Sequence, residues 1–456
     1  MRTENRRYML VISGFVIAFL SLVLFLTYFD TFKSESLATN PNNPRLYIDK
    51  QVYQRGNIYN KQKEMIAYSE YEDNKAKRVF PYAEVNAPIT GYQSTTLGQT
   101  GLEKSYNKEL LGLDTEDKND NKKIGYDIYT TLDQRIQNIV YDELKDKTAS
   151  MVISNPKTGE IIAMVSTPTF DPNNLEENWD NLIQAQNGEM MNRATQGTYR
   201  PGSSMKIVTS AGILENNLNE FYNDTGSEYI KNFRIRNFGY YHYGQVDLAE
   251  ALRYSINTYF ANKTMAMGYD GYKQITDRFM FNQKYKFDLD KAQNVIPYSE
   301  IYDADLAMTG FGYGKTQTNP LHMSMIVGSV ANKGKMMQPY LVSSVVDKAG
   351  TVIKETKPEV LSTTMSETNA EYLKELLSYT VEEGFDNTIK GQNIAGKTGT
   401  VENNKGTNEV WFVGVYPVNN PKYAFALVVE NTSFTGSEVA SPLVGKILRR
   451  IEKNEK

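Results

Sequence analysis

Residues 8–29 form an uninterrupted apolar run, "YMLVISGFVIAFLSLVLFLTYF", with no charged side chain. A helix of this length reaches across the hydrocarbon core of a bilayer. Residues 1–7 carry three arginines, and basic residues before a span favour a cytoplasmic N-terminus. We therefore expect a short cytoplasmic tail (1–7), a single-pass membrane anchor (8–29) and a remainder outside the cytoplasm.

A cleaved signal peptide is the competing interpretation of the same run. The apolar region of a signal peptide is usually shorter, about 7–15 residues. The following segment "ESLATN" is also a poor cleavage site. A retained anchor is the favoured interpretation.

The pattern beyond the anchor divides at about residue 123. Residues 34–45, "SESLATNPNNPR", are polar and rich in turn formers, which indicates a short tether. Up to residue 113 the chain has short strand-like pieces and no long apolar period, which predicts a small, extended, β-rich domain. The charged run "DTEDKNDNKK" at 114–123 then marks a loop or domain boundary.

The pattern is denser from residue 124 onward. Thr130 or Thr131 is expected to cap a helix whose apolar face carries Ile136, Ile139, Val140 and Leu144. The remaining pattern predicts a β-hairpin at 149–170, helices at 206–217 and 248–267, strands at 392–401, 409–418 and 423–431, and a closing helix at 441–456. Strands at both ends with helices between them predict an α+β domain, whose antiparallel sheet is covered by helices.

Composition narrows the chemistry. The chain has 456 residues, enough for two or three domains, and its net charge of −4 gives no footprint for nucleic acid. It contains no cysteine, which excludes disulfides, thiolate metal sites and a cysteine nucleophile. Neither of its two histidines, His242 and His322, lies in a nucleophile context. If a base is needed, lysine is the better candidate, and we expect no metal or cofactor.

The pattern S-x-x-K occurs three times, at Ser105–Lys108, Ser154–Lys157 and Ser203–Lys206. Only Ser203 has a Pro-Gly break before it and a sustained apolar helix behind it. A helix starting at Ser154 would have to run through Pro156 and Gly159. A serine and a lysine three positions apart share one helix face, so Lys206 is placed to contact the Ser203 hydroxyl.

Two further motifs follow Ser203 along the chain. "SINTYF" supplies Ser255 and Asn257, and "AGKTGTVENN" supplies Lys397-Thr398-Gly399-Thr400 in a strand-like segment. A second K-T-G, at 157–159, lies at the tip of the predicted hairpin and is expected to be structural. Three motifs in this order, each on a suitable element, are far more specific than any one alone.

The order S-x-x-K, S-x-N, K-T-G resembles the pattern of penicillin-binding proteins and class A β-lactamases. "NRATQGTYRPGSSMK", "NPKTGEIIAMVSTPTFDPN" and "GFGYGKTQTNPLHMSMI" also resemble landmarks of the class B, monofunctional transpeptidases, as does "RGNIYNKQKEMIA" near residue 55. The resemblance covers most of the chain. It implies an anchor, a non-catalytic domain at 30–123, which we call the pedestal, and a transpeptidase domain at 124–456. The middle motif departs from the pattern, with Ser-Ile-Asn in place of Ser-Asp-Asn.

The resemblance implies a role for each motif residue. Ser203 would attack a D-alanyl-D-alanine carbonyl, with Lys206 as its base, Ser255 passing a proton to the leaving amine and Asn257 holding the substrate amide. Lys206 must be neutral for this, and burial together with the Lys397 cation would lower its pKa.

The third motif would bind the other end of the substrate. Lys397, Thr398, Gly399 and Thr400 would hold its terminal carboxylate. The backbone N–H groups of Ser203 and Thr400 would form the oxyanion hole.

Other functions of the same fold remain open. A D,D-carboxypeptidase shares these motifs, and a β-lactam-hydrolysing or β-lactam-sensing enzyme shares the fold, while an intact set of motifs argues against an inactive scaffold. By this resemblance, the protein is expected in a bacterial cell membrane, with peptidoglycan stem peptides, β-lactams, a membrane-embedded SEDS-family glycosyltransferase and other cell-wall assembly proteins as partners. A separate glycosyltransferase is expected because residues 30–123 are too few for a glycosyltransferase domain. No nucleic-acid partner is expected.

Overall fold

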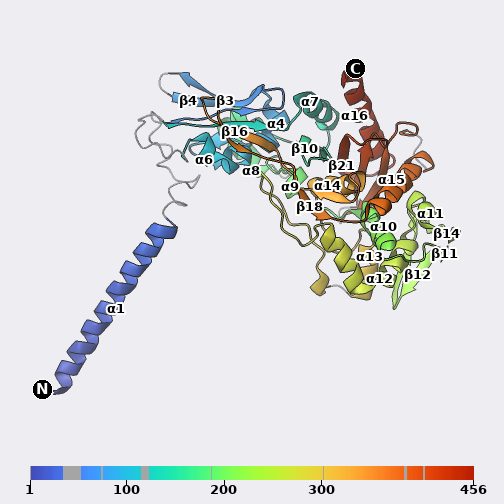
Figure 1. The fold of residues 1–456 in the computed structure, drawn as a ribbon, viewed down its shortest axis with the longest axis horizontal. Helices are drawn as coiled ribbons and strands as arrows, with labels where there is room; N and C mark the ends of the chain where they lie inside the picture. The colour runs from blue at the N-terminus through green and yellow to red at the C-terminus, as the bar shows by residue number, and fades with distance from the viewer. Residues whose placement is uncertain are drawn as a thin grey trace.

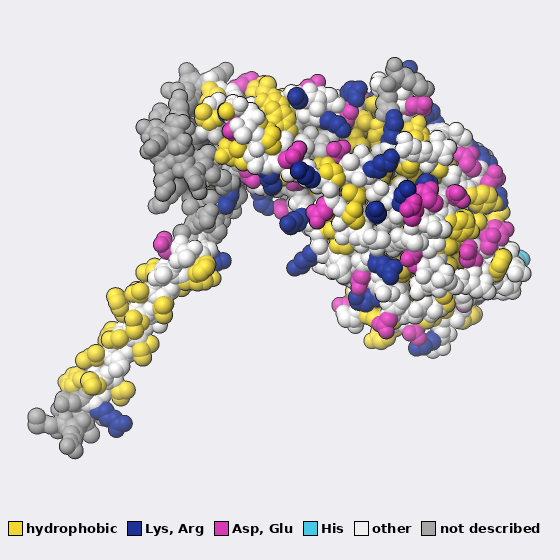
Figure 2. Space-filling view, viewed as in Figure 1, with side chains coloured by type: hydrophobic (Ala, Val, Ile, Leu, Met, Phe, Trp, Pro, Cys, Tyr) yellow, Lys and Arg dark blue, Asp and Glu magenta, His cyan; other side chains and the backbone are white. Residues whose placement is uncertain are grey.

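The computed structural model describes residues 2–33, 53–72, 75–113, 123–185, 187–300, 302–384, 388–403 and 406–455. The predicted anchor forms one helix, α1 (Arg2–Phe32), and its apolar span, Tyr8–Phe32, is long enough to cross a membrane. Apolar side chains cover this helix over most of its length (Figure 2). The predicted tether at 34–45 and most of the predicted boundary loop, 114–122, lie outside the described residues.

A six-stranded sheet joins the pedestal to later parts of the chain. Its strand order is β17-β16-β8-β2-β3-β4, and Figure 1 shows the late strand β16 in the same region as the early strands β3 and β4. The strands are β2 (Ile58–Tyr59), β3 (Met65–Glu72), β4 (Lys75–Val79), β8 (Asp127–Thr130), β16 (Val342–Val346) and β17 (Val352–Glu355). The parallel pair β2–β8 places Ile58 opposite Ile128, and both side chains are completely buried. The sheet thus contains strands from both sides of residue 123, and the division there stays a prediction.

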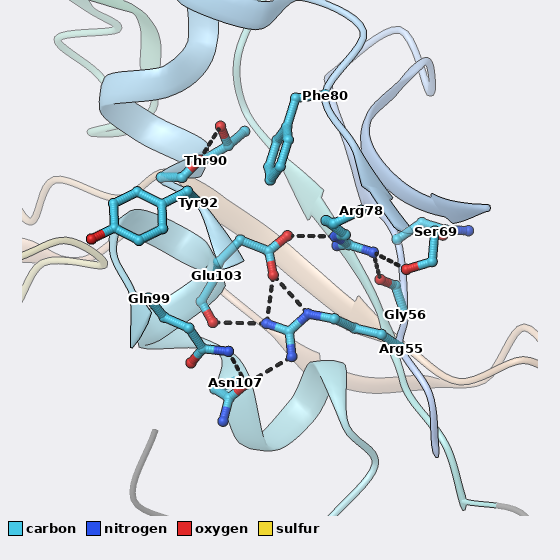
Figure 3. A network of polar contacts seen from close by, with 12 residues as sticks. Arg55, Gly56, Ser69, Arg78, Phe80, Thr90, Tyr92, Gln99, Glu103 and Asn107 are labelled. Atoms are coloured by element: carbon cyan, nitrogen blue, oxygen red, sulfur yellow. Dashed lines mark hydrogen bonds and ion pairs between the residues drawn. The ribbon is translucent and has the colours of Figure 1, made fainter. Parts of the chain in front are cut away.

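A buried ion cluster stabilises the pedestal (Figure 3). Glu103, which is completely buried, accepts hydrogen bonds from Arg55 Nε and Arg78 Nε, each at 2.7 Å. Arg55 also donates to Asn107 Oδ1 at 2.7 Å, and Arg78 to the Gly56 carbonyl at 2.8 Å. The Glu103 carboxylate therefore connects its own helix α5 (Gly101–Ser105) with the segment around residue 55 and strand β4, and Arg55 extends the cluster to α6 (Asn107–Leu110).

The C-terminal domain is built on a five-stranded antiparallel sheet of order β10-β9-β21-β20-β19. Its strands are β9 (Ala149–Ser154), β10 (Ile161–Thr167), β19 (Ala395–Glu402), β20 (Asn408–Tyr416) and β21 (Tyr423–Thr432). Strand β9 pairs with β21, so the first and last strand segments meet in mid-sheet, and β19 forms one edge. The predicted α+β fold, hairpin and C-terminal strands are confirmed.

Helices cover both faces of this sheet. Because alternate side chains of a strand point to opposite faces, each strand contributes to two cores. Met151 and Ile153 belong to a core with α7 (Gln134–Leu144) and α16 (Ala440–Glu455). Val152 belongs to the core on the other face, with α10 (Lys206–Glu215) and α14 (Pro320–Ala331). In Figure 1, α7 and α16 lie on one side of the sheet and α14 on the other. A sheet covered on both faces accounts for strands that are buried along their whole length.

Two local predictions are wrong. The N-cap of α7 is Asp133, whose carboxylate accepts the backbone N–H groups of Arg135 and Ile136, whereas Thr130 lies in β8 and Thr131 donates to the Ile161 carbonyl. The helix expected at 248–267 is two helices, α11 (Leu248–Arg253) and α12 (Asn257–Arg278). Ser255, between them, has a left-handed backbone conformation with φ +55°, which a continuous helix does not permit.

The other described helices are α4 (Ala83–Thr90), α8 (Leu175–Gln184), α9 (Arg193–Gln196), α13 (Asp303–Thr309), α15 (Glu367–Glu382), η1 (Pro172–Asn174), η2 (Gly202–Met205), η3 (Phe238–Tyr240) and η4 (Tyr298–Glu300). The other described strands are β1 (Tyr53–Gln54), β5 (Gln93–Ser94), β6 (Gly98–Gln99), β7 (Lys123–Ile124), β11 (Tyr222–Asp224), β12 (Ser227–Ile230), β13 (Phe233–Arg236), β14 (Gly244–Val246), β15 (Lys335–Met337) and β18 (Val360–Thr363).

Candidate active site

Ser203 lies in the short helix η2, which leads directly into α10. Gly202 before it has φ +54°, and a Cβ there would lie 2.6 Å from Val401 Cγ2. A Cβ on Gly399 would lie 2.8 Å from the Pro201 carbonyl oxygen. Two glycines therefore let the turn that carries Ser203 pack directly against strand β19.

Hydrogen bonds join four of the predicted site residues. Ser255 Oγ lies 2.9 Å from Ser203 Oγ. Lys206 Nζ donates to Ser255 Oγ at 3.0 Å, to the Ser255 carbonyl at 2.7 Å and to Asn257 Oδ1 at 2.8 Å. Lys206 was expected to contact Ser203 itself, but the structure links the two residues through the Ser255 hydroxyl.

Lys206 is completely buried, which is unusual for a lysine. Burial lowers the pKa of Lys206 well below its ordinary value, and the Lys397 cation lowers it further. Lys397 is itself buried, and burial lowers its pKa to about 8. The surroundings of Lys206 therefore favour the neutral amine that a general base requires.

Strand β19 brings the third motif beside Ser203. Lys397 is buried, whereas Thr398 and Thr400 are half-buried and line the open side of the strand. The Thr400 hydroxyl accepts a hydrogen bond from the Gly436 backbone N–H at 3.0 Å. Because β19 is the edge strand of its sheet, it is placed to form one wall of a cleft.

That cleft has a volume of about 920 Å³. Its lining includes seven of the eight predicted site residues: Ser203, Ser255, Asn257, Lys397, Thr398, Gly399 and Thr400. Lys206 is the eighth and lies beneath the surface, in contact with the cleft through Ser255 and Asn257. The structure thus brings together all the residues that the sequence singled out.

The other two S-x-x-K copies are arranged differently. Ser105 ends α5, while Lys108 belongs to the separate helix α6. Ser154 ends strand β9, and Lys157 lies in the hairpin turn, where it donates to Asn420 Oδ1 at 2.7 Å. In neither pair do the serine and the lysine share one helix face. Neither pair therefore has the arrangement that was expected for Ser203 and Lys206.

Sequence reasoning missed the buried network that positions Asn257. Asp224 accepts hydrogen bonds from Thr258 Oγ1 at 2.6 Å and from Asn237 Nδ2 at 2.9 Å, and Asn237 Oδ1 accepts the Thr258 backbone N–H at 3.1 Å. The network holds the first turn of α12, where Asn257 stands, against the segment after β13. No sequence signal marked these residues, because their partners are far apart along the chain.

A second missed contact supports the Ser203 turn. The Gly202 N–H donates to the Gly312 carbonyl at 3.0 Å, and a Cβ on Gly312 would lie 2.0 Å from the Gly202 carbonyl oxygen. Gly312 belongs to "GFGYG", a segment whose family resemblance was the one available signal. The Trp411 indole also fixes the approach to the turn, since it donates to the Arg200 carbonyl at 3.1 Å.

The histidines have no part in the hydrogen-bond chain of the site. His322 is completely buried in α14, where its ring nitrogens contact Thr318 Oγ1 and the Phe279 carbonyl. Burial lowers the pKa of His322 to about 4. His242 is exposed. Within the described ranges, no three His, Asp or Glu side chains are grouped as metal ligands.

Comparison with protein families places this fold and site. The family model of the penicillin binding protein transpeptidase domain matches residues 149–449, and that of the penicillin binding protein A dimerisation domain matches residues 55–124. The chain is 29% identical to the peptidoglycan D,D-transpeptidases PbpA of Mycolicibacterium smegmatis and Mycobacterium tuberculosis, over 97% of each chain.

Solved structures agree with the family match. Penicillin-binding protein A from M. tuberculosis, as a ceftriaxone acyl-enzyme complex, is 27% identical with a TM-score of 0.82, over 88% of this chain and 99% of that one. A D,D-transpeptidase domain from Eggerthella lenta is 28% identical with a TM-score of 0.81 and the same coverage. The fold and these comparisons define a serine-type D,D-transpeptidase whose long apolar N-terminal helix fits a membrane anchor. The chain belongs to the penicillin-binding protein transpeptidase family, and its dimerisation domain followed by one transpeptidase domain is the arrangement of class B.

Proposed function

We propose that this protein is a peptidoglycan D,D-transpeptidase, inhibited by β-lactams, in which Ser203 is the acylated residue. The observation that carries the proposal is the hydrogen-bond chain from Ser203 through Ser255 to the buried amine of Lys206, at the wall of a large cleft. The names of the relatives and the acyl-enzyme structures support the reaction class.

In the acylation step, neutral Lys206 accepts the Ser203 proton, by way of the Ser255 hydroxyl. Ser203 Oγ forms a bond to the carbonyl carbon of the penultimate D-alanine, and the C–N bond to the terminal D-alanine breaks. The proton then returns through Ser255 to the leaving amine, so that Lys206 is neutral again. Lys397 assists by keeping a positive charge near Lys206, which disfavours a second charged amine there.

Substrate binding uses the two walls of the cleft. Asn257 lines the cleft, and its side-chain amide holds the amide of the acyl-donor peptide. Lys397, Thr398 and Thr400 bind the terminal carboxylate, with Gly399 allowing close approach. The backbone N–H groups of Ser203 and Thr400 stabilise the oxyanion of the tetrahedral intermediate.

An amine of a second stem peptide then attacks the ester and releases Ser203, which forms the cross-link. Water in place of the amine would make the enzyme a D,D-carboxypeptidase. That alternative uses the same residues, so the ratio of cross-linked to hydrolysed product decides between the two.

We further propose the membrane arrangement of the chain: a cytoplasmic tail (1–7), an anchor (8–29), a pedestal (30–123) and a transpeptidase domain (124–456) outside the cytoplasm. A SEDS-family glycosyltransferase is the partner that would supply glycan strands. Full-length protein should remain with membranes after a carbonate wash, and protease added outside spheroplasts should degrade the transpeptidase domain. Release of a chain beginning near Thr39 would instead show a cleaved signal peptide.

The direct test is acylation by a fluorescent penicillin, followed by mass spectrometry of the labelled peptide. Ser203→Ala should abolish labelling, whereas Ser105→Ala and Ser154→Ala, the other S-x-x-K serines, should retain it. Labelling that survives in Ser203→Ala, or that is lost in folded Ser154→Ala, would overturn the assignment.

A further inference from the structure

The cleft that contains Ser203 has an excess of positive charge. Among the described residues that line it, Arg234, Arg236, Arg253 and Lys397 are cationic, and Glu438 alone is acidic. The Glu438 carboxylate already accepts the backbone N–H and the hydroxyl of Thr435, at 2.8 and 2.7 Å. The chain as a whole is acidic, with a net charge of −4. The positive field is therefore local to the cleft and favours an anionic ligand.

Arg236 is the arginine most closely connected to the reacting groups. It is the last residue of β13, and its carbonyl accepts a hydrogen bond from Asn257 Nδ2 at 3.1 Å. Asn257 in turn accepts the Lys206 amine at 2.8 Å. The Arg236 backbone is thus one side chain away from the general base, on the wall where the acyl-donor amide is proposed to bind.

The Arg236 guanidinium is available for a ligand. The side chain is exposed, its charge lies 5.2 Å from the centre of the Tyr240 ring, and none of the described ion pairs involves it. Arg234 has contacts of the same two kinds, with the Ser227 hydroxyl at 3.1 Å and the Tyr229 ring, but no described hydrogen bond connects its backbone to Asn257. Arg236 Nη1 donates a long hydrogen bond to the Tyr240 hydroxyl at 3.4 Å, and together with the ring contact this orients the guanidinium. The remaining N–H donors of the guanidinium can still bind a planar acceptor such as a carboxylate.

Arg253 adds a second positive charge on the neighbouring wall. It ends α11, two residues before Ser255, and its Nε donates to the Glu383 carbonyl at 2.6 Å. Its guanidinium lies 4.8 Å from the centre of the Tyr254 ring. A hydrogen bond to a neutral carbonyl leaves this charge uncompensated, so it strengthens the attraction of the cleft for anions.

We propose that Arg236 is a specificity-determining residue, which binds a second carboxylate of the acyl-donor peptide, N-terminal to the D-alanyl-D-alanine unit. This subsite is distinct from the terminal-carboxylate site at Lys397, because Arg236 ends β13 whereas Lys397 lies in β19. The inference rests on the proposed function, because the peptide must be anchored at Ser203 for its inner residues to reach β13. Enzyme with this subsite prefers donors with a free inner carboxylate over donors with a carboxamide there.

Two penicillins that differ by one carboxylate test the subsite. Benzylpenicillin and its α-carboxy derivative both acylate the nucleophile, and the acylamino group that bears the extra charge corresponds to the inner part of the donor peptide. The readout is the ratio of their second-order acylation rate constants, derivative over parent, with full-length protein in detergent. A general loss of activity cancels in this ratio.

Arg236→Gln should lower the ratio by roughly 1.4- to fivefold, the range that about 0.2–1 kcal/mol for an exposed ion pair corresponds to. Arg236→Lys should retain part of it, and Arg449→Gln, which removes an exposed arginine on α16 outside the cleft, should leave it at the wild-type value. In wild type, raising the salt from about 0.05 to about 0.5 M should lower the ratio by screening. Donor peptides with a carboxylate or a carboxamide at one inner position should show the same loss of preference in Arg236→Gln.

A ratio that is equal in Arg236→Gln and Arg449→Gln, or independent of salt in wild type, would refute the subsite while Ser203 is still acylated. If wild type fails to acylate Ser203 with either penicillin, the proposed function fails and the subsite fails with it. The two failures are therefore distinguishable, and the salt series needs no variant at all.

Discussion

The hydroxyl of Ser255 lies 2.9 Å from the hydroxyl of Ser203. Ser255 reaches this position because its backbone, with φ +55°, interrupts the chain between α11 and α12. The same break turns the Ser255 carbonyl towards Lys206 Nζ, at 2.7 Å. A strained residue thus supplies two of the contacts that hold Lys206, the proposed general base. Strain of this kind costs about 1–3 kcal/mol and persists where the surroundings impose it.

Replacing Ser255 separates its chemistry from its backbone. Ser255→Ala and Ser255→Gly both remove the hydroxyl that we propose transfers the proton, and each should lower the acylation rate constant about 10²- to 10⁴-fold. Glycine adopts positive φ without strain, so the Gly variant should be more stable than the Ala variant by about 1 kcal/mol. Acylation kinetics and thermal unfolding of the pair check this. Acylation within tenfold of wild type would show that Lys206 reaches Ser203 without Ser255.

The pH dependence of acylation should follow the two buried lysines. Because its pKa is lowered by burial and by Lys397, Lys206 loses its proton at a pH where an exposed lysine is still charged. The rate should therefore rise with pH through the lowered pKa of Lys206. It should fall above a pH of about 8, as Lys397 loses the proton with which it binds the carboxylate.

Variants of the two lysines assign the limbs of this profile. In Lys397→Met the neighbouring cation is gone, so the pKa of Lys206 should rise and the ascending limb should move to higher pH. Lys206→Arg should not acylate at any pH, because a guanidinium does not become neutral. An ascending limb that is unmoved in Lys397→Met would contradict the electrostatic coupling.

Glu103→Gln should destabilise the pedestal by about 3–5 kcal/mol, since it leaves two buried arginines without their counter-ion. Faster hydrogen exchange in β3 and α5 of the full chain would report the loss. Asp290→Asn is the matched control, because its ion pair with Lys104 at 2.7 Å is largely exposed and should matter by less than about 1 kcal/mol. Equal exchange in the two variants would mean that the cluster contributes little.

Acid should also destabilise the wild-type pedestal, because it protonates Glu103. Burial opposes the charged form of Glu103, but Arg55 and Arg78 outweigh it and hold the pKa of the carboxyl below its ordinary value. A lowered folded-state pKa contributes stability that is present above the unfolded pKa and is lost as the pH falls through the folded one. The protection of the β3 amides, taken relative to unstructured amides at the same pH, should decrease with acidity in wild type and change less in Glu103→Gln.

Motif order alone located the active site, because the chemistry needs particular residue types on particular elements. The Pro-Gly break before Ser203 and the strand around Lys397 are local features, and the structure keeps both. The contact between Lys206 and Ser255 was harder to predict from the sequence, since it depends on the left-handed turn at Ser255. A turn without glycine gives no sequence signal, and the helical pattern on either side of it concealed the break.

Pairing between segments that are far apart in the sequence was the second feature that could not be predicted. Strands β16 and β17, around residues 342–355, complete a sheet that begins near residue 58, and nothing in their own pattern specifies that partner. Asp224 likewise acts through Asn237 and Thr258, and no two of the three are close in sequence. Local periodicity predicts elements, whereas partners at this separation are chosen by the packing of the whole domain.

The lifetime of the acyl-enzyme separates a transpeptidase from a β-lactamase. A hydrolase needs a base that delivers water to the ester, and class A β-lactamases use a glutamate. The carboxylate among the described residues lining this cleft is Glu438, which is engaged with Thr435 at 2.7 and 2.8 Å. We therefore predict a penicilloyl adduct on Ser203 that persists for many minutes at neutral pH, measured by the decay of the adduct mass.

Glu438→Gln should leave that lifetime unchanged, because the bonds to Thr435 already occupy its carboxylate. A longer lifetime in this variant would identify Glu438 as a deacylating base and would favour a hydrolase. Turnover of penicillin by wild type at more than about 1 s⁻¹, a rate ordinary for a dedicated enzyme, would do the same without any variant. A persistent adduct in both proteins is the result expected of an enzyme whose ester waits for an acceptor amine.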